Sequence, residues 1–208
     1  MTGLGDEGRL LSEQGYLALE NFLPDDQFAM LLAEADKAVA SANADAPAQV
    51  GEGRQFGAKK AHPWGFDRHD GGTLNRFLEI NPTLHPCASE FSRHERLSAL
   101  SEAISGGRQK SKYVWFYLTL HGDQERASDP QKAFHRDTFF SSLKFWYFLK
   151  PVSEQEGPFE YVPGSHKLTA ERLDWEHEKA TAAIARPRGK RSSSFRISEA
   201  ELSGMNLP

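Results

Sequence analysis

A histidine and an aspartate separated by one residue are the side chains in this sequence best suited to metal chemistry. His135-Arg136-Asp137 places an imidazole and a carboxylate at positions i and i+2. On a β-strand these positions point to the same face, so His135 and Asp137 converge while Arg136 faces away. Such a pair supplies two of the three ligands of a 2-His-1-carboxylate site, which holds non-haem Fe(II) and leaves positions open for cosubstrate and dioxygen.

A second pair with the same spacing, His121-Gly122-Asp123, shows that the spacing alone identifies little. With eight histidines and 29 acidic residues in 208 positions, roughly one His-x-acid pair is expected by chance. The surroundings distinguish the two pairs. His121 ends an apolar run and is followed by glycine, which is typical of a loop entry, whereas His135 and Asp137 lie between aromatic strands.

The aromatic residues predict where those strands are. Of the 23 aromatic residues, 11 fall in the 36 positions from Tyr113 to Phe148, and this density favours strands over helices. We expect strands at 112–121, 143–150 and 159–162, and a short strand at 16–22. Prolines and glycines between these segments mark the turns.

Helical periodicity is found mainly outside that window. Apolar residues recur at helical spacing over 25–42, after two aspartates that suit the first turn of a helix. Further helices are predicted over 89–104, over 170–183 after Thr169, and after the capping-box spacing of Ser198 and Glu201, while 44–57 is predicted as a loop. The pattern indicates one α+β domain, with a mainly helical layer over 1–110 and the core strands over 111–208.

Composition favours a globular protein and excludes several other classes. Hydrophobic residues make up 38% of the chain, enough for a core, and the net charge of −4 argues against a nucleic-acid binder. A single cysteine, Cys87, excludes a disulfide framework and a multi-cysteine zinc site. The first residues lack a long apolar run, so we expect no signal peptide among them, and the longest apolar stretch, 114–120, is far shorter than a membrane span. We therefore expect a cytoplasmic protein that binds neither nucleic acid nor membrane.

The stretch that follows Asp137 resembles a known family. An aromatic strand, Lys144-Phe145-Trp146-Tyr147-Phe148-Leu149-Lys150, leads through a turn at Gly157-Pro158 to Pro163-Gly164-Ser165-His166. This order of an HxD, an aromatic strand, a glycine turn and a Pro-Gly-Ser/Thr-His segment resembles the phytanoyl-CoA dioxygenase family of Fe(II)- and 2-oxoglutarate-dependent oxygenases. The opening, 11–16 and 21–24, is similar too. The resemblance covers most of 11 to about 175.

The resemblance implies a fold and a set of site residues. The fold would be a double-stranded β-helix, a cupin-like jelly roll, with N-terminal helices packed on its outer sheet. His135 and Asp137 would be two iron ligands, and Trp146 matches a strand position beside 2-oxoglutarate. Strand parity would turn Lys144 inward with Trp146, where it could meet a carboxylate or remain at the rim. Tyr117 would line the cosubstrate pocket from the preceding strand, although ordinary core packing is an alternative for Tyr117 and Trp146.

The same resemblance implies a third ligand that the sequence does not match. In the family this ligand is a histidine on a much later strand, followed by an arginine that pairs with the far carboxylate of 2-oxoglutarate. The histidine that corresponds to His166 closes a turn and is not a ligand. We therefore expect 1–208 to be a single incomplete dioxygenase domain, truncated before its last strands, with a degenerate family member as the alternative.

Three hypotheses about function follow from the sequence. The first is an oxygenase that uses Fe(II), 2-oxoglutarate and O₂ to hydroxylate a small-molecule substrate, inactive as the truncated chain. The second is a non-catalytic jelly-roll module for binding or regulation, because fold does not fix function. A zinc hydrolase is a distant third, since no third ligand has suitable spacing. The basic stretch 186–191 is interpreted as a solvated loop, with steering of an anionic substrate as the alternative. The oligomeric state is left open.

Overall fold

The fold comes from a computed structural model, in which 5–49, 62–105, 114–121, 130–139, 142–187, 194–205 and residue 207 are described. The α-helices are α1 (Gly5–Gln14), α2 (Asp25–Asp45), α3 (Pro86–Phe91), α4 (Glu95–Ser105), α5 (Ala170–Ile184) and α6 (Glu199–Ser203). The strands are β1 (Gly65–Asp70), β2 (Thr73–Glu79), β3 (Trp115–His121), β4 (His135–Arg136) and β5 (Phe195–Arg196). Two 3₁₀ turns lie at Pro130–Lys132 and Glu154–Glu156.

Strands β1, β2 and β3 form an antiparallel sheet in sequence order. Asp70 pairs with Thr73 across a two-residue turn of glycines, in which Gly71 has a φ of +60°. Positive φ favours glycine, so the turn chemistry fixes the register of this hairpin. On the other side, Phe77 of β2 pairs with Tyr117 of β3. The middle strand β2 therefore determines where the residues of both neighbours lie.

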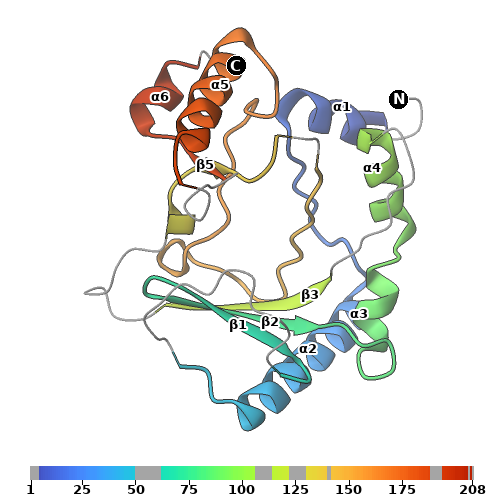
Figure 1. Cartoon of the computed structure of the whole chain (residues 1–208). Helices are drawn as coiled ribbons and strands as arrows, with labels where there is room; N and C mark the ends of the chain where they lie inside the picture. Colours follow the sequence, from blue (N-terminus) through green and yellow to red (C-terminus); the bar gives the residue numbers. More distant parts are fainter. Residues whose placement is uncertain are drawn as a thin grey trace.

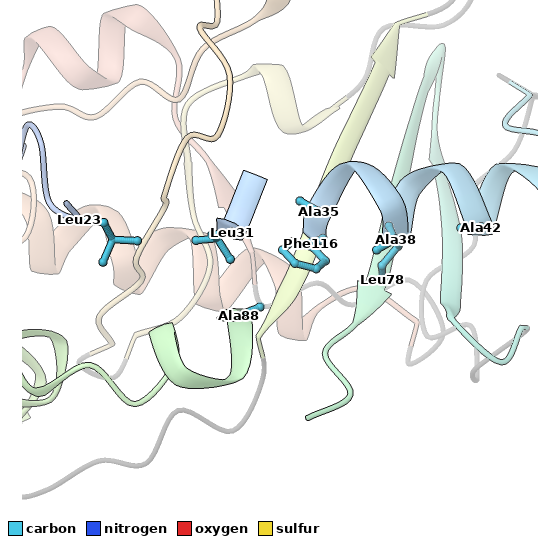
Figure 2. Close-up of a cluster of buried hydrophobic side chains, with 8 residues drawn as sticks. All are labelled: Leu23, Leu31, Ala35, Ala38, Ala42, Leu78, Ala88 and Phe116. Atoms are coloured by element: carbon cyan, nitrogen blue, oxygen red, sulfur yellow. The ribbon is translucent and has the colours of Figure 1, made fainter. Parts of the chain in front are cut away.

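Helix α2 covers one face of this sheet and forms the core with it (Figure 1). Its buried residues, Leu31, Ala35, Ala38 and Ala42, recur at intervals of four, three and four, which places them on one helix face. They pack against Leu78 of β2 and Phe116 of β3 (Figure 2). The small alanines allow close approach of helix and sheet. The opposite face of the sheet is consequently the one that can contribute to a site.

A second group of elements lies across the molecule from the sheet, where α5, α6 and β5 are together at the upper left of Figure 1. Strand β4 pairs antiparallel with β5, with Arg136 opposite Phe195. The segment 142–165, which includes the 3₁₀ turn at Glu154–Glu156, runs between this group and the sheet (Figure 1). The His-x-Asp motif thus begins at β4, on the side of the molecule built by α5.

The predicted helices are largely confirmed, because their signals are local. The predicted helix 25–42 is found as α2, which continues to Asp45. The first two residues of the predicted loop 44–57 therefore belong to this helix, and residues 50–57 lie outside the described ranges. Thr169 caps α5 by accepting a hydrogen bond from the Arg172 amide, and Ser198 and Glu201 form the expected capping box of α6. Helix α1 was not predicted.

The helix predicted over 89–104 is wrong in one respect, because the structure divides it into α3 and α4. The Ser92 hydroxyl donates to the Ser89 carbonyl at 2.7 Å, and the Arg96 amide donates to His94 Nδ1 at 3.2 Å. Side chains that bond the backbone in this way compete with helix continuation and begin a new helix instead.

The strand predictions need more correction. The strand predicted over 112–121 is found as β3, with 112 and 113 outside the described ranges. The segments 16–22, 143–150 and 159–162 are not assigned as strands, because a strand requires ladder hydrogen bonds with a neighbour, which aromatic composition alone does not provide. Strands β1 and β2 were not predicted. The described residues therefore show an α+β arrangement with antiparallel strands, and the facing sheets of the expected jelly roll are not seen among them.

Within these described ranges, none of the helices combines the length and apolar character needed to span a bilayer. The predicted basic loop is described only at its beginning, where Arg186 follows α5, and 188–191 lie outside the described residues.

Candidate functional site

The two residues predicted as metal ligands lie close together. His135 is the first residue of β4, and Asp137 follows the last. His135 Nε2 and Asp137 Oδ1 are 3.5 Å apart, and the side chains are 20% and 42% exposed. Two donors at this separation, both reachable by solvent, could be bridged by one metal ion after a small adjustment.

The imidazole of His135 is oriented by the backbone. Its Nδ1 lies 2.7 Å from the carbonyl oxygen of Ala133. A carbonyl oxygen only accepts hydrogen bonds, so Nδ1 carries a proton and donates it. In the neutral ring this leaves the lone pair on Nε2, the nitrogen that faces Asp137. The local backbone therefore selects the tautomer that a metal ligand requires.

Electrostatics couple the two candidate ligands to each other. When the ring is protonated, Nε2–H donates to Asp137, and this hydrogen bond raises the pKa of His135 against the opposing effect of the ring's partial burial. A metal ion bound at Nε2 would take the place of that proton. The pKa of Asp137 lies well below its usual range, first because of His135 and then because of Lys144, with burial opposing both. Asp137 is thus an anion at neutral pH and available as a ligand.

Lys144 lies at this pair and contacts Asp137 directly. Its ammonium donates to Asp137 Oδ2, the oxygen that does not face His135. The sequence left two readings for Lys144, a contact with a carboxylate or a position at the rim. The structure places its side chain 56% exposed and in contact with a carboxylate of the chain itself. Each oxygen of Asp137 therefore has one partner, which fixes the orientation of the carboxylate.

Trp146 and Tyr117, the other predicted site residues, contact each other. Their ring centroids are 5.8 Å apart, and Trp146 stacks on Phe159 at 5.5 Å. Tyr117 and Trp146 are 41% and 44% exposed, so ordinary core packing does not account for them. The Tyr117 hydroxyl donates to Asn75 Oδ1 at 2.5 Å, which anchors this aromatic row to the sheet.

The expected alternation along 143–150 is present in part. Tyr147 turns away from Trp146 and packs against Phe22, Phe28 and Phe91 beside the core. Phe145 has the same parity as Tyr147 along the chain but is 44% exposed. Extended chain without a ladder partner is not held to strict two-residue alternation, which explains this departure.

The other histidines considered from the sequence have structural partners. His121 Nε2 lies 2.8 Å from the Glu156 carbonyl, and Asp123 lies outside the described residues. His166 Nε2 lies 2.9 Å from the Ser12 carbonyl, which joins the turn at 163–166 to helix α1. Over the described part of the chain, no group of three or more His, Cys, Asp or Glu side chains is arranged to hold a metal ion.

Sequence reasoning missed a polar network on the sheet face opposite α2. Asp70 Oδ2 accepts from Arg68 Nε at 2.5 Å and from Asn75 Nδ2 at 3.2 Å, and Asn75 in turn accepts from Tyr117 and Thr119. Asp70 and Asn75 are buried. Asp-Gly-Gly-Thr at 70–73 is a hairpin signal that could have revealed these strands.

Comparison with known proteins identifies the family. The family model described as phytanoyl-CoA dioxygenase (PhyH) matches residues 11–195. A search of curated proteins and a search of solved structures gave no match. The matched region contains the His-x-Asp motif, the aromatic segment and the Pro-Gly-Ser-His turn, as the sequence had indicated. This chain therefore belongs to the phytanoyl-CoA dioxygenase family.

Proposed function

We propose that the chain forms the metal-binding part of an Fe(II)- and 2-oxoglutarate-dependent oxygenase that hydroxylates a small-molecule substrate, with His135 and Asp137 as two iron ligands. The observation that carries the proposal is the imidazole and carboxylate 3.5 Å apart in the matched region. Family membership supports the reaction class, and the substrate itself is left open.

The donor set fits ferrous iron. Imidazole nitrogen and carboxylate oxygen are the donors of the 2-His-1-carboxylate sites that bind Fe(II). Nδ1 of His135 is engaged by Ala133 and Oδ2 of Asp137 by Lys144, so a metal ion would bind the remaining two atoms in place of their contact with each other. Nε2 and Oδ1 are the atoms left to face the metal. When bound, Fe(II) supplies the redox chemistry that couples decarboxylation of 2-oxoglutarate, with O₂, to hydroxylation of a C–H bond.

The chain's own residues orient the ligands and shape their surroundings. Ala133 holds the His135 ring, and Lys144 holds Asp137 so that one oxygen is presented. In this proposal Lys144, Trp146 and Tyr117 form the wall beside the cosubstrate. Support comes from the contact of Lys144 with Asp137 and from the exposed aromatic row that continues to the sheet. Exposed rings of this kind exclude water once a ligand covers them.

The experiment is an anaerobic titration of the 208-residue chain with Fe(II) and millimolar 2-oxoglutarate, followed by metal-to-ligand charge-transfer absorbance. We expect a weak, saturable signal that disappears in His135→Ala. His121→Ala is the matched control, because His121 belongs to the rival pair and has the same spacing. Wild-type protein without absorbance, or absorbance that survives His135→Ala, contradicts the proposal and favours the non-catalytic module.

A further inference from the structure

The residue between the two proposed ligands is anchored in the opposite direction. Arg136 Nε lies 2.6 and 2.7 Å from the two carboxylate oxygens of Glu176, and Nη2 donates to the same carboxylate. Glu176 comes from α5 and is only 4% exposed, while the Arg136 side chain is 15% exposed. A forked arginine–carboxylate contact fixes both distance and orientation. Arg136 therefore has one position relative to α5.

A second arginine contacts the same carboxylate. Arg172, one helical turn before Glu176, donates to Glu176 Oε1 from Nη2 at 2.8 Å. It also donates to the Ser165 carbonyl. A buried carboxylate left without cations is strongly destabilising. Because Arg172 remains, Glu176 would keep a partner even if Arg136 were replaced.

The guanidinium of Arg136 is also held through its flat face. It lies 4.0 Å from the ring centroid of Phe195, the residue opposite Arg136 in the β4–β5 pairing. Phe195 packs edge-on against Trp175 of α5 at 6.3 Å. The Ile197 amide donates to the Phe134 carbonyl at 2.9 Å and extends the pairing beyond β4. Hydrogen bonds and stacking together leave the Arg136 side chain no freedom to rotate.

We propose that the Arg136–Glu176 pair positions the His135-x-Asp137 motif, because it fixes the rotation of β4 about its own axis. Neighbouring residues of an extended chain point to opposite sides. Within β4, holding Arg136 towards α5 therefore turns His135 to the other side, and Asp137 lies with His135 at 3.5 Å. This inference rests on the proposed function in treating the two residues as metal ligands. Arg136 and Glu176 are positioning residues and touch neither metal nor substrate.

The test compares Arg136→Met with Arg172→Met in the 208-residue chain. The two arginines are matched: their side chains are 15% and 14% exposed, both donate to Glu176, and each lies over an aromatic ring. Only Arg136 lies within the motif. We expect similar losses of thermal stability from both substitutions. We expect roughly a tenfold or greater loss of Co(II) affinity from Arg136→Met alone, within the range for residues that orient metal ligands. Arg136→Lys should recover part of that affinity.

A second readout needs no metal. In the metal-free chain at constant pH, the NMR signal of the His135 ring, assigned by its loss in His135→Ala, should shift or broaden in Arg136→Met and stay unchanged in Arg172→Met. Equal effects of the two substitutions would overturn the inference, as would an unchanged signal in Arg136→Met. If either methionine variant does not fold, Arg136→Lys and Arg172→Lys make the same comparison. Co(II) affinity unaffected by His135→Ala would refute the proposed function, while the NMR comparison would still decide the positioning role.

Discussion

The packing of α2 on the sheet leads to a prediction about β2, the strand that aligns both neighbours. Leu78 is 1% exposed and lies in the core with Leu31 and Phe116. Truncation to alanine would leave a cavity between helix and sheet, because backbone elements relax only partly around a lost side chain. A buried leucine replaced in this way costs about 2–5 kcal/mol of unfolding free energy.

The assay is urea denaturation followed by tryptophan fluorescence. At a slope of about 2–3 kcal/mol per molar urea, the midpoint of Leu78→Ala should fall by roughly 1–2 M, with the slope unchanged. Leu84→Ala removes the same atoms from a residue that is 69% exposed, so its unfolding free energy should stay within about 0.5 kcal/mol of wild type. Equal midpoints for the two variants would refute the placement of β2 against α2.

Three further predictions concern charge and the proposed site. Hydrogen bonding to Lys179 lowers the pKa of Glu201 to about 2, below its unfolded value of about 4.3, so its contribution to stability is present above pH 4.3 and is lost as the pH falls towards 2. Between about pH 5 and 2, the thermal midpoint of Glu201→Gln should depend less on pH than that of the wild-type chain. The same pH dependence in both proteins would contradict this. Asp137→Ala should remove the charge-transfer absorbance but change the thermal midpoint by no more than about 3 °C, because a partly exposed ion pair contributes about 1 kcal/mol at most. A large loss of stability would instead show that the His135–Asp137 pair has a structural role. The 208-residue chain should not turn over 2-oxoglutarate, because the resemblance to the family predicts no match in it for the third histidine and the arginine; succinate formation clearly above a His135→Ala control would show that another ligand completes the site.

The helices could be predicted from the sequence because their signals lie within a few residues. Thr169 and Ser198 each accept a hydrogen bond from an amide three positions later, and such capping depends little on the rest of the fold. The two acidic residues at the start of α2 belong to the same class of local signal. Helix ends that depend on side-chain competition, as at Ser92, are harder to predict because the same residues are compatible with both outcomes.

The sheet was harder to predict, and the reasons differ between segments. Strand β1 carries three charged residues whose partners are on β1 itself or on β2: Arg68 bonds Asp70 within the strand, Asn75 bonds Asp70, and Arg76 bonds Asp67. Polar composition therefore concealed it. The segment 143–150 has the opposite problem, since its aromatic residues favour strands but no ladder partner lies beside it in the described ranges. Strand propensity reflects a packed environment more than a backbone preference.

The candidate site shows the same division between local and distant information. The spacing of His135 and Asp137 is local, and it was sufficient to predict that both side chains converge. The same spacing occurs at His121, so it could not by itself distinguish the two pairs. The contacts around the His135 pair are distant in sequence: Lys144 comes seven residues after Asp137, and Glu176 lies 40 residues beyond Arg136. Spacing alone could not predict these contacts, because they depend on how the segment 142–150 and helix α5 pack against the motif.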